Sequence, residues 1–254
     1  MRRYRMSACF ILVWLLCATD LRAAEDAKVG PWVKINERDG IIAYARTNSR
    51  VTLKEGRVVG VINSSAANIE NMMRDWEAYT KVLFMSKKAI PADFPGCKAS
   101  QDTYCAYLLQ GLPWPLEDRD GYGSLNFFIH KPTGEVLVKV SVGENTMPLT
   151  KGVTRIPFCE MAWMIKPIDA THCQVTYQNM VEPGGSVGSI PAPIINYIMK
   201  HFGIFTIQNI RKLAKENKYQ HATGFMTQTP WPEELRYYAE EVKTNTCALK
   251  EGDR

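Results

Sequence analysis

The sequence of 254 residues lacks the patterns that mark metal-dependent, nucleotide-binding and nucleic-acid-binding proteins. It holds only four histidines and no CxxC pair, so the ligand spacing of a zinc site is missing. Gly184-Gly185 is not followed by the Lys-Ser/Thr pair of a phosphate-binding loop. The formal net charge is only +5, and arginines near the amino terminus contribute part of it. We therefore expect no metal, no cofactor and no nucleic-acid partner.

The amino terminus has the composition of a secretory leader. Three arginines within Met1–Arg5 precede an apolar run over 6–18, and the small residues Ala23 and Ala24 follow. This order predicts a signal peptide over residues 1–23. The run of about 13 apolar residues is short for a ~30 Å bilayer core, but an uncleaved membrane anchor stays open, as does lipidation at Cys17. No later segment has the pattern of a transmembrane helix.

Five cysteines remain after the leader: Cys97, Cys105, Cys159, Cys173 and Cys247. Export would place them in an oxidising compartment, where disulfides form. Cys97 and Cys105 are the best local pair, because a Pro-Gly loop (Pro95, Gly96) lies beside them and a strand-like segment begins near Thr103. Cys159 and Cys173 flank a predicted hairpin but stand about four positions out of register. The odd number leaves at least one cysteine unpaired or in an intermolecular bond, and the rest of the pairing stays open.

Several short strands precede one long helix in the predicted order of elements. Strand patterns occur at 41–46, 57–63, 86–90, 103–110, 121–130 and 135–142. Ser64 or Ser65 is expected to cap a helix over 66–79, whose apolar residues recur at helical spacing. A second, longer helix follows the prolines Pro191 and Pro193 and extends to about Ala214, with a broad apolar stripe.

A hairpin over 154–166 and 173–181 is the clearest strand pattern. One face of the first segment carries Cys159, Met161, Trp163 and Ile165, and one face of the second carries Cys173, Val175, Tyr177, Asn179 and Val181. A period of two with polar residues opposite predicts antiparallel strands with a wet outer face. The whole pattern predicts an α+β fold, a bent antiparallel sheet closed by the carboxy-terminal helix. Beyond residue 214 we expect a tail (215–254) with one helical patch at 232–242.

Five motifs follow one another along residues 31–214. They are Trp32 with Asp39-Gly40-Ile41 and Tyr44; Leu112–Asp120 (LPWPLEDRD); Arg155-Ile156-Pro157 with Trp163 and Pro167; Glu182-Pro183-Gly184-Gly185 with Ile190-Pro191 and Asn196; and Ile210–Leu213. In this order they resemble the bacterial branch of the START (steroidogenic acute regulatory protein-related lipid transfer) family. Two departures, the extra residues Ser186–Ser189 and Pro193, lie where that family has its gate. Ligand size and opening therefore do not carry over.

The resemblance implies a helix-grip (Bet v 1-like) fold over 31–214, a curved antiparallel sheet wrapped around the last helix with an internal hydrophobic cavity. It also implies binding of a sterol, phospholipid or fatty acyl compound, with transfer between membranes as the family's common use of such a cavity. We expect a monomer that contacts membrane surfaces transiently. With the leader, this predicts export to the periplasm of a Gram-negative bacterium, with secretion as the alternative.

The candidate ligand-binding residues come from the inward strand faces and the apolar stripe of the last helix. They are Arg155, Met147, Met161, Trp163, Val175, Tyr177, Ile198, Phe202 and Phe205. Each apolar member also fits ordinary packed core. Arg155 shares the parity of Trp163, so it is expected either to meet a ligand headgroup or to pair with an acid such as Asp118 or Glu117.

Two further features stay open from the sequence. Asp118-Arg119-Asp120 fits either a polar contact at the mouth of the cavity or a turn between strands. Gly184-Gly185 fits a turn or a hinge, and as a hinge it would let the last helix open for ligand exchange.

Catalysis is the less favoured function. The superfamily includes polyketide cyclases and dehydratases, which need acids and bases placed in the pocket. His130, His172, His201 and His221 fall on a strand end, a turn, a helix and the tail, and share no face. We therefore predict that the chain is not an enzyme. A ligand-free interaction module of the cell envelope is a second alternative.

Overall fold

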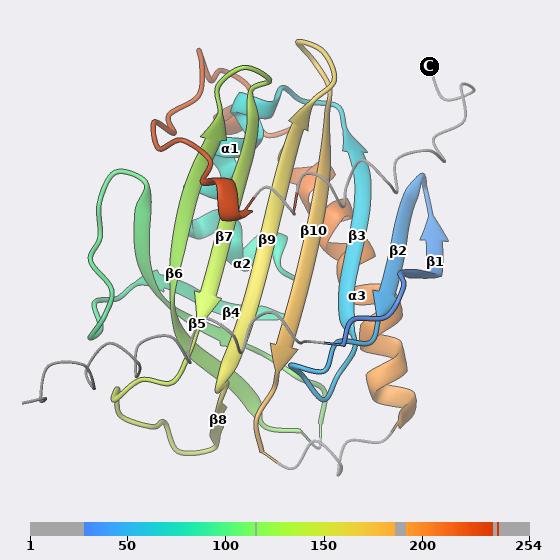
Figure 1. The fold of residues 1–254 in the computed structure, drawn as a ribbon, viewed down its shortest axis with the longest axis vertical. Helices are drawn as coiled ribbons and strands as arrows, with labels where there is room; N and C mark the ends of the chain where they lie inside the picture. The colour runs from blue at the N-terminus through green and yellow to red at the C-terminus, as the bar shows by residue number, and fades with distance from the viewer. Residues whose placement is uncertain (1–27, 115, 186–191, 236–237, 239–254) are drawn as a thin grey trace, which may run out of the picture.

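The computed structural model describes residues 28–114, 116–185, 192–235 and 238. Ten strands form a single sheet that curves around the helices on one of its faces, and the long helix α3 crosses behind β3 and β10 (Figure 1). The strands are β1 (Val33–Arg38), β2 (Ile41–Arg46), β3 (Glu55–Ile62), β4 (Ser86–Pro91), β5 (Thr103–Gln110), β6 (Asp118–His130), β7 (Glu135–Val142), β8 (Val153–Arg155), β9 (Phe158–Pro167) and β10 (Cys173–Glu182). The helices are α1 (Ala66–Met73), α2 (Trp76–Val82) and α3 (Ala192–Leu213), with 3-10 turns η2 (Asn217–Tyr219) and η3 (Glu233–Leu235).

The order of the strands is β1-β2-β3-β10-β9-β7-β6-β5-β4, with every pair on this path antiparallel. The short strand β8 lies off the path and pairs in parallel with β6. A long antiparallel sheet that grips a carboxy-terminal helix is the α+β helix-grip fold, so the predicted fold class is confirmed.

The β9–β10 hairpin has the predicted faces. Tyr177 pairs with Trp163, Val175 with Ile165, and Val181 with Cys159. These side chains therefore share the inner face of the sheet, toward the helices. Cys159 and Cys173 remain free thiols, because Cys173 pairs with Pro167 and Cys159 with Val181, which puts the two cysteines eight residues out of register rather than about four.

The segment predicted as one strand over 154–166 is divided in the structure. β8 ends at Arg155 and β9 begins at Phe158, because Pro157 has no N–H to continue a ladder. The amide of Ile156 instead donates to Asp120 O over 2.8 Å, which turns the chain toward β6. The alternation of inward and outward side chains therefore does not extend from Trp163 back to Arg155.

The helix predicted over 66–79 is two helices. Ser65 caps α1, since its Oγ accepts from the amide of Asn68 over 3.2 Å, which agrees with one of the two predicted caps. After α1 ends, the Oδ1 of Asp75 accepts from the amide of Glu77 over 3.0 Å and starts α2 as a new N-cap. The aspartate favours a cap over a helix interior, so the chain bends between Met73 and Trp76.

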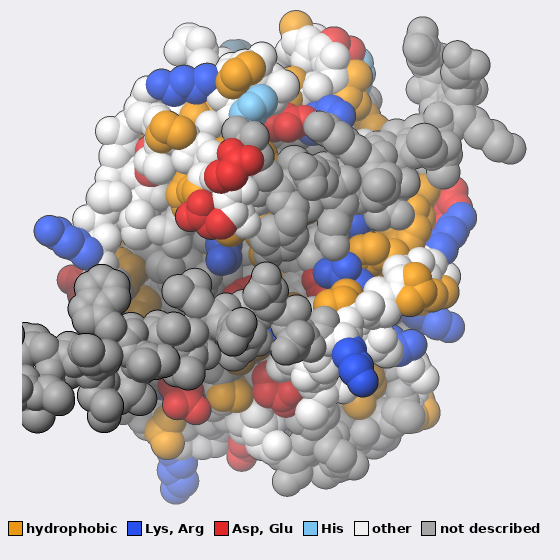
Figure 2. Space-filling view, in the orientation of Figure 1, with side chains coloured by type: hydrophobic (Ala, Val, Ile, Leu, Met, Phe, Trp, Pro, Cys, Tyr) orange, Lys and Arg blue, Asp and Glu red, His pale blue; other side chains and the backbone are white. Residues whose placement is uncertain are grey.

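Part of the tail beyond α3 packs onto the sheet. Trp231, Leu235 and Tyr238 lie against Leu137, Ala162 and Met164 on the outer face of the sheet. The outer face is therefore not wet throughout, as the alternation alone had predicted, because the returning tail covers part of it. Elsewhere the described part of this face carries scattered side chains of both charge signs (Figure 2).

Several predictions fall outside the described residues. They concern the leader over 1–23, Cys17 and Cys247, the inserted Ser186–Ser189, and most of the predicted helix at 232–242. No helix among the described residues combines the length and the apolarity needed to cross a bilayer.

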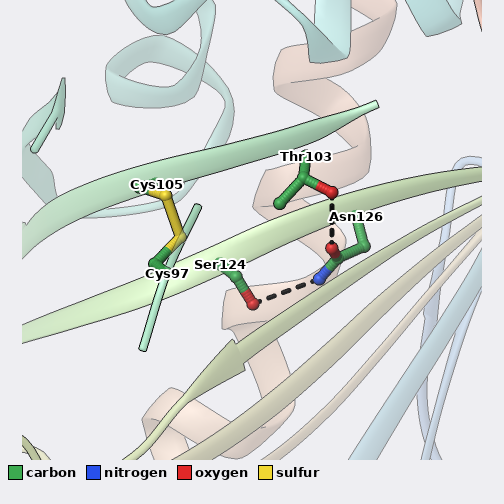
Figure 3. The surroundings of a disulfide bond; sticks show 5 residues. All are labelled: Cys97, Thr103, Cys105, Ser124 and Asn126. Carbon is green, nitrogen blue, oxygen red and sulfur yellow. Dashed lines mark hydrogen bonds between the residues drawn. A yellow bond between two sulfur atoms is a disulfide. The ribbon is translucent and has the colours of Figure 1, made fainter. Parts of the chain in front are cut away.

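A disulfide joins Cys97 and Cys105, which confirms the predicted local pair. It ties the loop after β4 to the outer face of β5, beside the hydrogen bonds that join Thr103, Asn126 and Ser124 (Figure 3). Thr103 donates to Asn126 over 3.0 Å, and Asn126 donates to Ser124 over 3.1 Å. The cross-link closes a short loop next to an already well-bonded strand pair.

Replacing both cysteines by serine is expected to lower the free energy of unfolding by about 2 kcal/mol, because the cross-link restricts the unfolded chain across a loop of 8 residues. Chemical denaturation of the oxidised protein and of the Cys97→Ser/Cys105→Ser variant measures the difference. Reductant should lower the stability of the wild type and leave the variant unchanged. Equal sensitivity of both proteins to reductant would contradict the prediction.

Candidate functional site

An apolar cavity of about 200 Å³ lies between the inner face of the sheet and α3. This volume is more than ten times the ~10–15 Å³ that holds one water molecule. Its wall is mostly hydrophobic and draws on β2, β3, β5, β6, β7, β9, β10 and α3, with Leu112 and Leu116 from the β5–β6 loop. An interior of this size in a folded domain is unusual, because protein cores are otherwise close-packed.

The inner side chains of β6 explain why the core is open at one end. Leu125 and Phe127 are fully buried and fill the end of the sheet that lies over α1 and α2. Gly121 and Gly123 follow on the same face toward the start of the strand. A Cβ on Gly121 would lie 2.7 Å from Cγ1 of Val142, so Gly121 has no room for a side chain there, and both residues line the cavity. The space opens where the inner residues change from large to small.

Four of the predicted ligand-binding residues line the cavity: Met161, Tyr177, Ile198 and Phe202. Tyr177 has its ring centroid 6.2 Å from that of Phe202. Its hydroxyl donates to the thioether of Met161 over 3.2 Å. A thioether is a weak acceptor, so this hydroxyl is a polar group that a ligand oxygen can engage.

The other five lie outside the wall. Trp163 and Val175 are fully buried beside Tyr177 and Ile165, and the Trp163 ring stacks on Tyr177 at 4.1 Å. Phe205 stacks on Phe84 at 4.8 Å. Met147 lies in the loop before β8, where its carbonyl accepts from Arg155. The structure thus places Trp163 and Val175 in a supporting layer behind the cavity wall.

Arg155 is engaged in a network on the other side of β6. Its Nε and Nη2 donate to the two carboxylate oxygens of Asp120 over 2.7 Å and 3.1 Å, and its Nη1 donates to Asn145 over 2.9 Å. The hydrogen bond to Asp120 raises the pKa of the Arg155 guanidinium. From the sequence, Asp118 or Glu117 was a candidate acid to pair with Arg155, but Asp118 pairs with Lys87 over 2.7 Å. The acid is Asp120.

Sequence reasoning missed several lining residues. Asn179 and Val181 share the inner face of β10 with Tyr177, and this alternation alone could have identified them. Arg119 lies on the same face of β6 as Leu125, but its Asp-Arg-Asp motif also fitted a turn between strands. Lys54 comes from the β2–β3 loop, which has no periodic signal.

The thiol of Cys159 in the cavity wall is not an activated nucleophile. Burial raises its pKa to about 12, so the thiol stays protonated at neutral pH. Burial likewise raises the pKa of Cys173 to about 12. No histidine lines the cavity among the described residues, and within the same residues no group of three or more His, Cys, Asp or Glu side chains could hold a metal ion.

No family model matches the chain, but it is similar in sequence or in structure to other proteins. It is 25% identical over 207 residues to an uncharacterized protein of Pseudomonas aeruginosa, a match covering 80% of this chain and 96% of that protein. A STAR-related lipid transfer protein fragment from Xanthomonas axonopodis superposes with a TM-score of 0.62 at 26% identity, over 73% of this chain and 99% of that one. Human StAR-related lipid transfer protein 5 superposes with a TM-score of 0.64 at 12% identity, over 80% and 94%. With its gripped helix, internal cavity and ordered motifs, the chain contains a START-like domain.

Proposed function

We propose that this protein binds a hydrophobic lipid in the cavity beneath its sheet. The observation that carries the proposal is an apolar interior space of about 200 Å³ in a START-like fold. Removing an acyl or sterol ligand from water contributes roughly 0.8 kcal/mol per buried methylene, which favours occupancy of such a space. Met161, Tyr177, Ile198 and Phe202 would contact the apolar part of the ligand. The protonated Cys159 thiol and a described cavity wall without histidine give no support to a catalytic alternative.

Extraction of the purified protein with organic solvent, followed by mass spectrometry, tests this function directly. A lipid carrier should release a stoichiometric lipid. Protein that releases none, and that binds no acyl or sterol probe when these are added back, would refute lipid binding and favour an interaction module.

Filling the cavity should weaken binding while the fold persists. Met161→Trp adds a large ring to the wall and is expected to weaken binding of an acyl probe on the order of 10-fold or more, with an overpacking cost of about 1–3 kcal/mol. Ile168→Trp is the matched control, because Ile168 is 54% exposed in the turn after β9 and lies outside the cavity wall. Fluorescence titration with a labelled fatty acid measures both. Equal affinities in the two variants would place the ligand elsewhere.

Transfer between membranes requires a surface that meets lipid, and the structure offers one beside the cavity. Trp114 is 90% exposed and Tyr197 is 50% exposed. An apolar groove is lined by Phe84, Met85, Pro113, Pro193, Ile194, Tyr197 and Ile198, and Trp114 directly follows Pro113 in the chain. Ile198 lines both the groove and the cavity, so we propose that this surface contacts membranes transiently when ligand is exchanged.

Trp114→Ala is expected to weaken association with phospholipid vesicles by about fivefold or more, because an exposed tryptophan prefers the bilayer interface. The thermal midpoint should not change, since the ring contributes little to the core. Vesicle co-sedimentation measures binding, and Leu149→Ala, another exposed apolar position at 76%, serves as the control away from the groove. An equal loss in both variants would argue against this surface.

We further propose that the protein acts outside the cytoplasm, in the periplasm or after secretion. The disulfide between Cys97 and Cys105 supports an oxidising compartment. Expression with residues 1–23 intact, followed by cell fractionation and mass determination of the mature chain, tests both export and cleavage.

A further inference from the structure

The charged residues of the cavity wall are all cationic among the described residues: Lys54, Arg57 and Arg119, with no aspartate or glutamate. Arg57 is directed away, because its guanidinium donates to Gln178 over 2.7 Å and lies over the ring of Trp32 at 4.2 Å. Two positive side chains, Arg119 and Lys54, are therefore left at an otherwise apolar chamber.

Arg119 is buried without a carboxylate partner. Only 6% of the residue is exposed, at the start of β6 and on its inner face. Its Nε donates to the carbonyl of Pro183 over 2.9 Å and its Nη1 to the carbonyl of Glu117 over 2.6 Å. Its Nη2 donates to no described residue, and no described carboxylate forms an ion pair with the guanidinium.

The neighbouring acids are all engaged elsewhere. Asp118 pairs with Lys87, and Asp120 pairs with Arg155. The carboxylate of Glu117 accepts from the hydroxyl of Thr154 over 2.7 Å. Glu182, at the end of β10, accepts from the amide and hydroxyl of Thr52 over 2.8 Å. None of the described acids therefore forms an ion pair with Arg119, and Glu117 acts on it only at longer range.

A buried, unpaired guanidinium is costly, because proteins otherwise pair a desolvated charge with an opposite one. Desolvation lowers the pKa of Arg119, and the more distant charge of Glu117 opposes this only in part. Such a residue is stabilised when an anion enters the cavity. A carboxylate or phosphate fits best, since guanidinium groups bind these oxygens through charge-assisted hydrogen bonds.

Lys54 supplies a second charge at the solvent side of the same cavity. It lies exposed in the β2–β3 loop, and no described acid pairs with it. The neighbouring Thr52 holds this loop to Glu182 and so fixes its position near the end of β10. Lys54 and Arg119 therefore place two positive side chains on the wall of one cavity.

We propose that the ligand is an amphiphile with an anionic headgroup, a carboxylate or a phosphate, which Arg119 binds with the assistance of Lys54. Its apolar chain occupies the cavity beside Met161 and Tyr177. The inference rests on the proposed lipid binding and adds the chemical class of the ligand. A role of Arg119 confined to holding the carbonyls of Pro183 and Glu117 would predict no preference among headgroups.

Three probes with the same acyl chain separate these possibilities: oleate, oleoyl lysophosphatidic acid and the neutral 1-oleoylglycerol. Competition against a fluorescent acyl probe should show the wild type binding at least one anionic probe on the order of 10-fold more tightly than the neutral one. Whether oleate or the phosphate binds more tightly identifies the headgroup. Arg119→Gln should remove most of that preference, Lys54→Gln should reduce it about 2- to 5-fold, and Arg50→Gln, at an exposed arginine paired with Glu160, should leave it unchanged.

The readout is the ratio of anionic to neutral affinity, which a merely structural role of Arg119 would not move. If Arg119→Gln fails to fold, Arg119→Lys and Lys54→Gln can be tested instead, and both should alter the ratio of anionic to neutral affinity. A wild type that binds the neutral probe as tightly as both anions would overturn this inference and leave lipid binding intact. A wild type that binds none of the three, and no sterol, would instead refute the proposed function.

Discussion

Replacing Arg74 by methionine is expected to destabilise the protein by about 3–5 kcal/mol, because it leaves two buried carboxylates without their cation. Arg74 Nε donates to Glu70 over 3.0 Å, and its Nη2 donates to Asp102 over 2.7 Å. Its side chain is only 4% exposed, and those of its partners are 0% and 8% exposed. Breaking one member of such a network costs more than any exposed ion pair contributes.

The same network holds the tail against the domain. Glu70 accepts from the amide and hydroxyl of Thr227 over 2.8 Å and 2.6 Å. Asp102 accepts from the amides of Gln228 and Thr229, each over 2.9 Å. We therefore expect Arg74→Met to release the segment around Thr227–Thr229, so limited proteolysis there should accelerate along with the loss of stability.

Arg50→Met is the matched control, since Arg50 is 40% exposed in its pair with Glu160, and its loss should cost less than about 1 kcal/mol. Urea denaturation of both variants measures the difference. Similar small losses in the two would show that the network around Arg74 contributes little.

Acid should weaken the network in a defined range of pH. Burial by itself would raise the pKa of Asp102, but hydrogen bonds from Arg74, Gln228 and Thr229 outweigh it and hold the pKa below its ordinary 3.8. A carboxyl whose pKa is lowered on folding stabilises the fold above its unfolded pKa, and this contribution is lost as the pH falls through the folded value. Wild-type stability should therefore decline below about pH 3.8, and Arg74→Met should lack part of that decline.

The sequence predicted the sheet and the last helix well, because both depend on local periodicity. The alternation of Trp163 and Tyr177 identified the inner face of β9 and β10, and the structure pairs these two residues directly. The disulfide could be predicted because Cys97 and Cys105 lie close in sequence. Features that join residues close in sequence, or that follow a strong periodic pattern, could be predicted from the sequence.

The polar contacts of the site were not predictable in this way. The partner of Arg155 is Asp120, 35 residues earlier, and the pairing depends on β8 lying parallel to β6. Because the strand is interrupted at Pro157, Arg155 does not lie on the same face as Trp163, although the alternation of side chains had suggested that it would. The tail's attachment to Glu70 and Asp102 likewise joins positions more than 120 residues apart, for which no local pattern exists.

Trp163 illustrates the limit for the cavity itself. Its position on the inner face was correctly predicted, but alternation cannot distinguish a residue that lines a cavity from one that supports the wall. Tyr177 lines the cavity, and the ring of Trp163 stacks against the ring of Tyr177 from behind the wall.

Trp163→Ala is expected to cost about 3–5 kcal/mol and to enlarge the cavity, because it removes the ring that supports Tyr177. Trp163 is fully buried, and its ring lies 4.1 Å from that of Tyr177. With the support gone, Tyr177 can move back from the cavity, so the variant should accept a bulkier ligand relative to a single acyl chain. Denaturation measures the stability, and competition between oleate and cholesterol measures the change in ligand preference.

Trp163→Phe provides the control that separates packing from hydrogen bonding. The indole N–H of Trp163 is buried and has no hydrogen-bond partner among the described residues, so replacing it forfeits no such bond. Phenylalanine keeps an aromatic surface against Tyr177, and the expected loss is below about 1.5 kcal/mol, with ligand preference retained. If the phenylalanine variant lost as much stability as the alanine variant, the indole would be making a polar contact instead, which places an acceptor within the interior beside Tyr177.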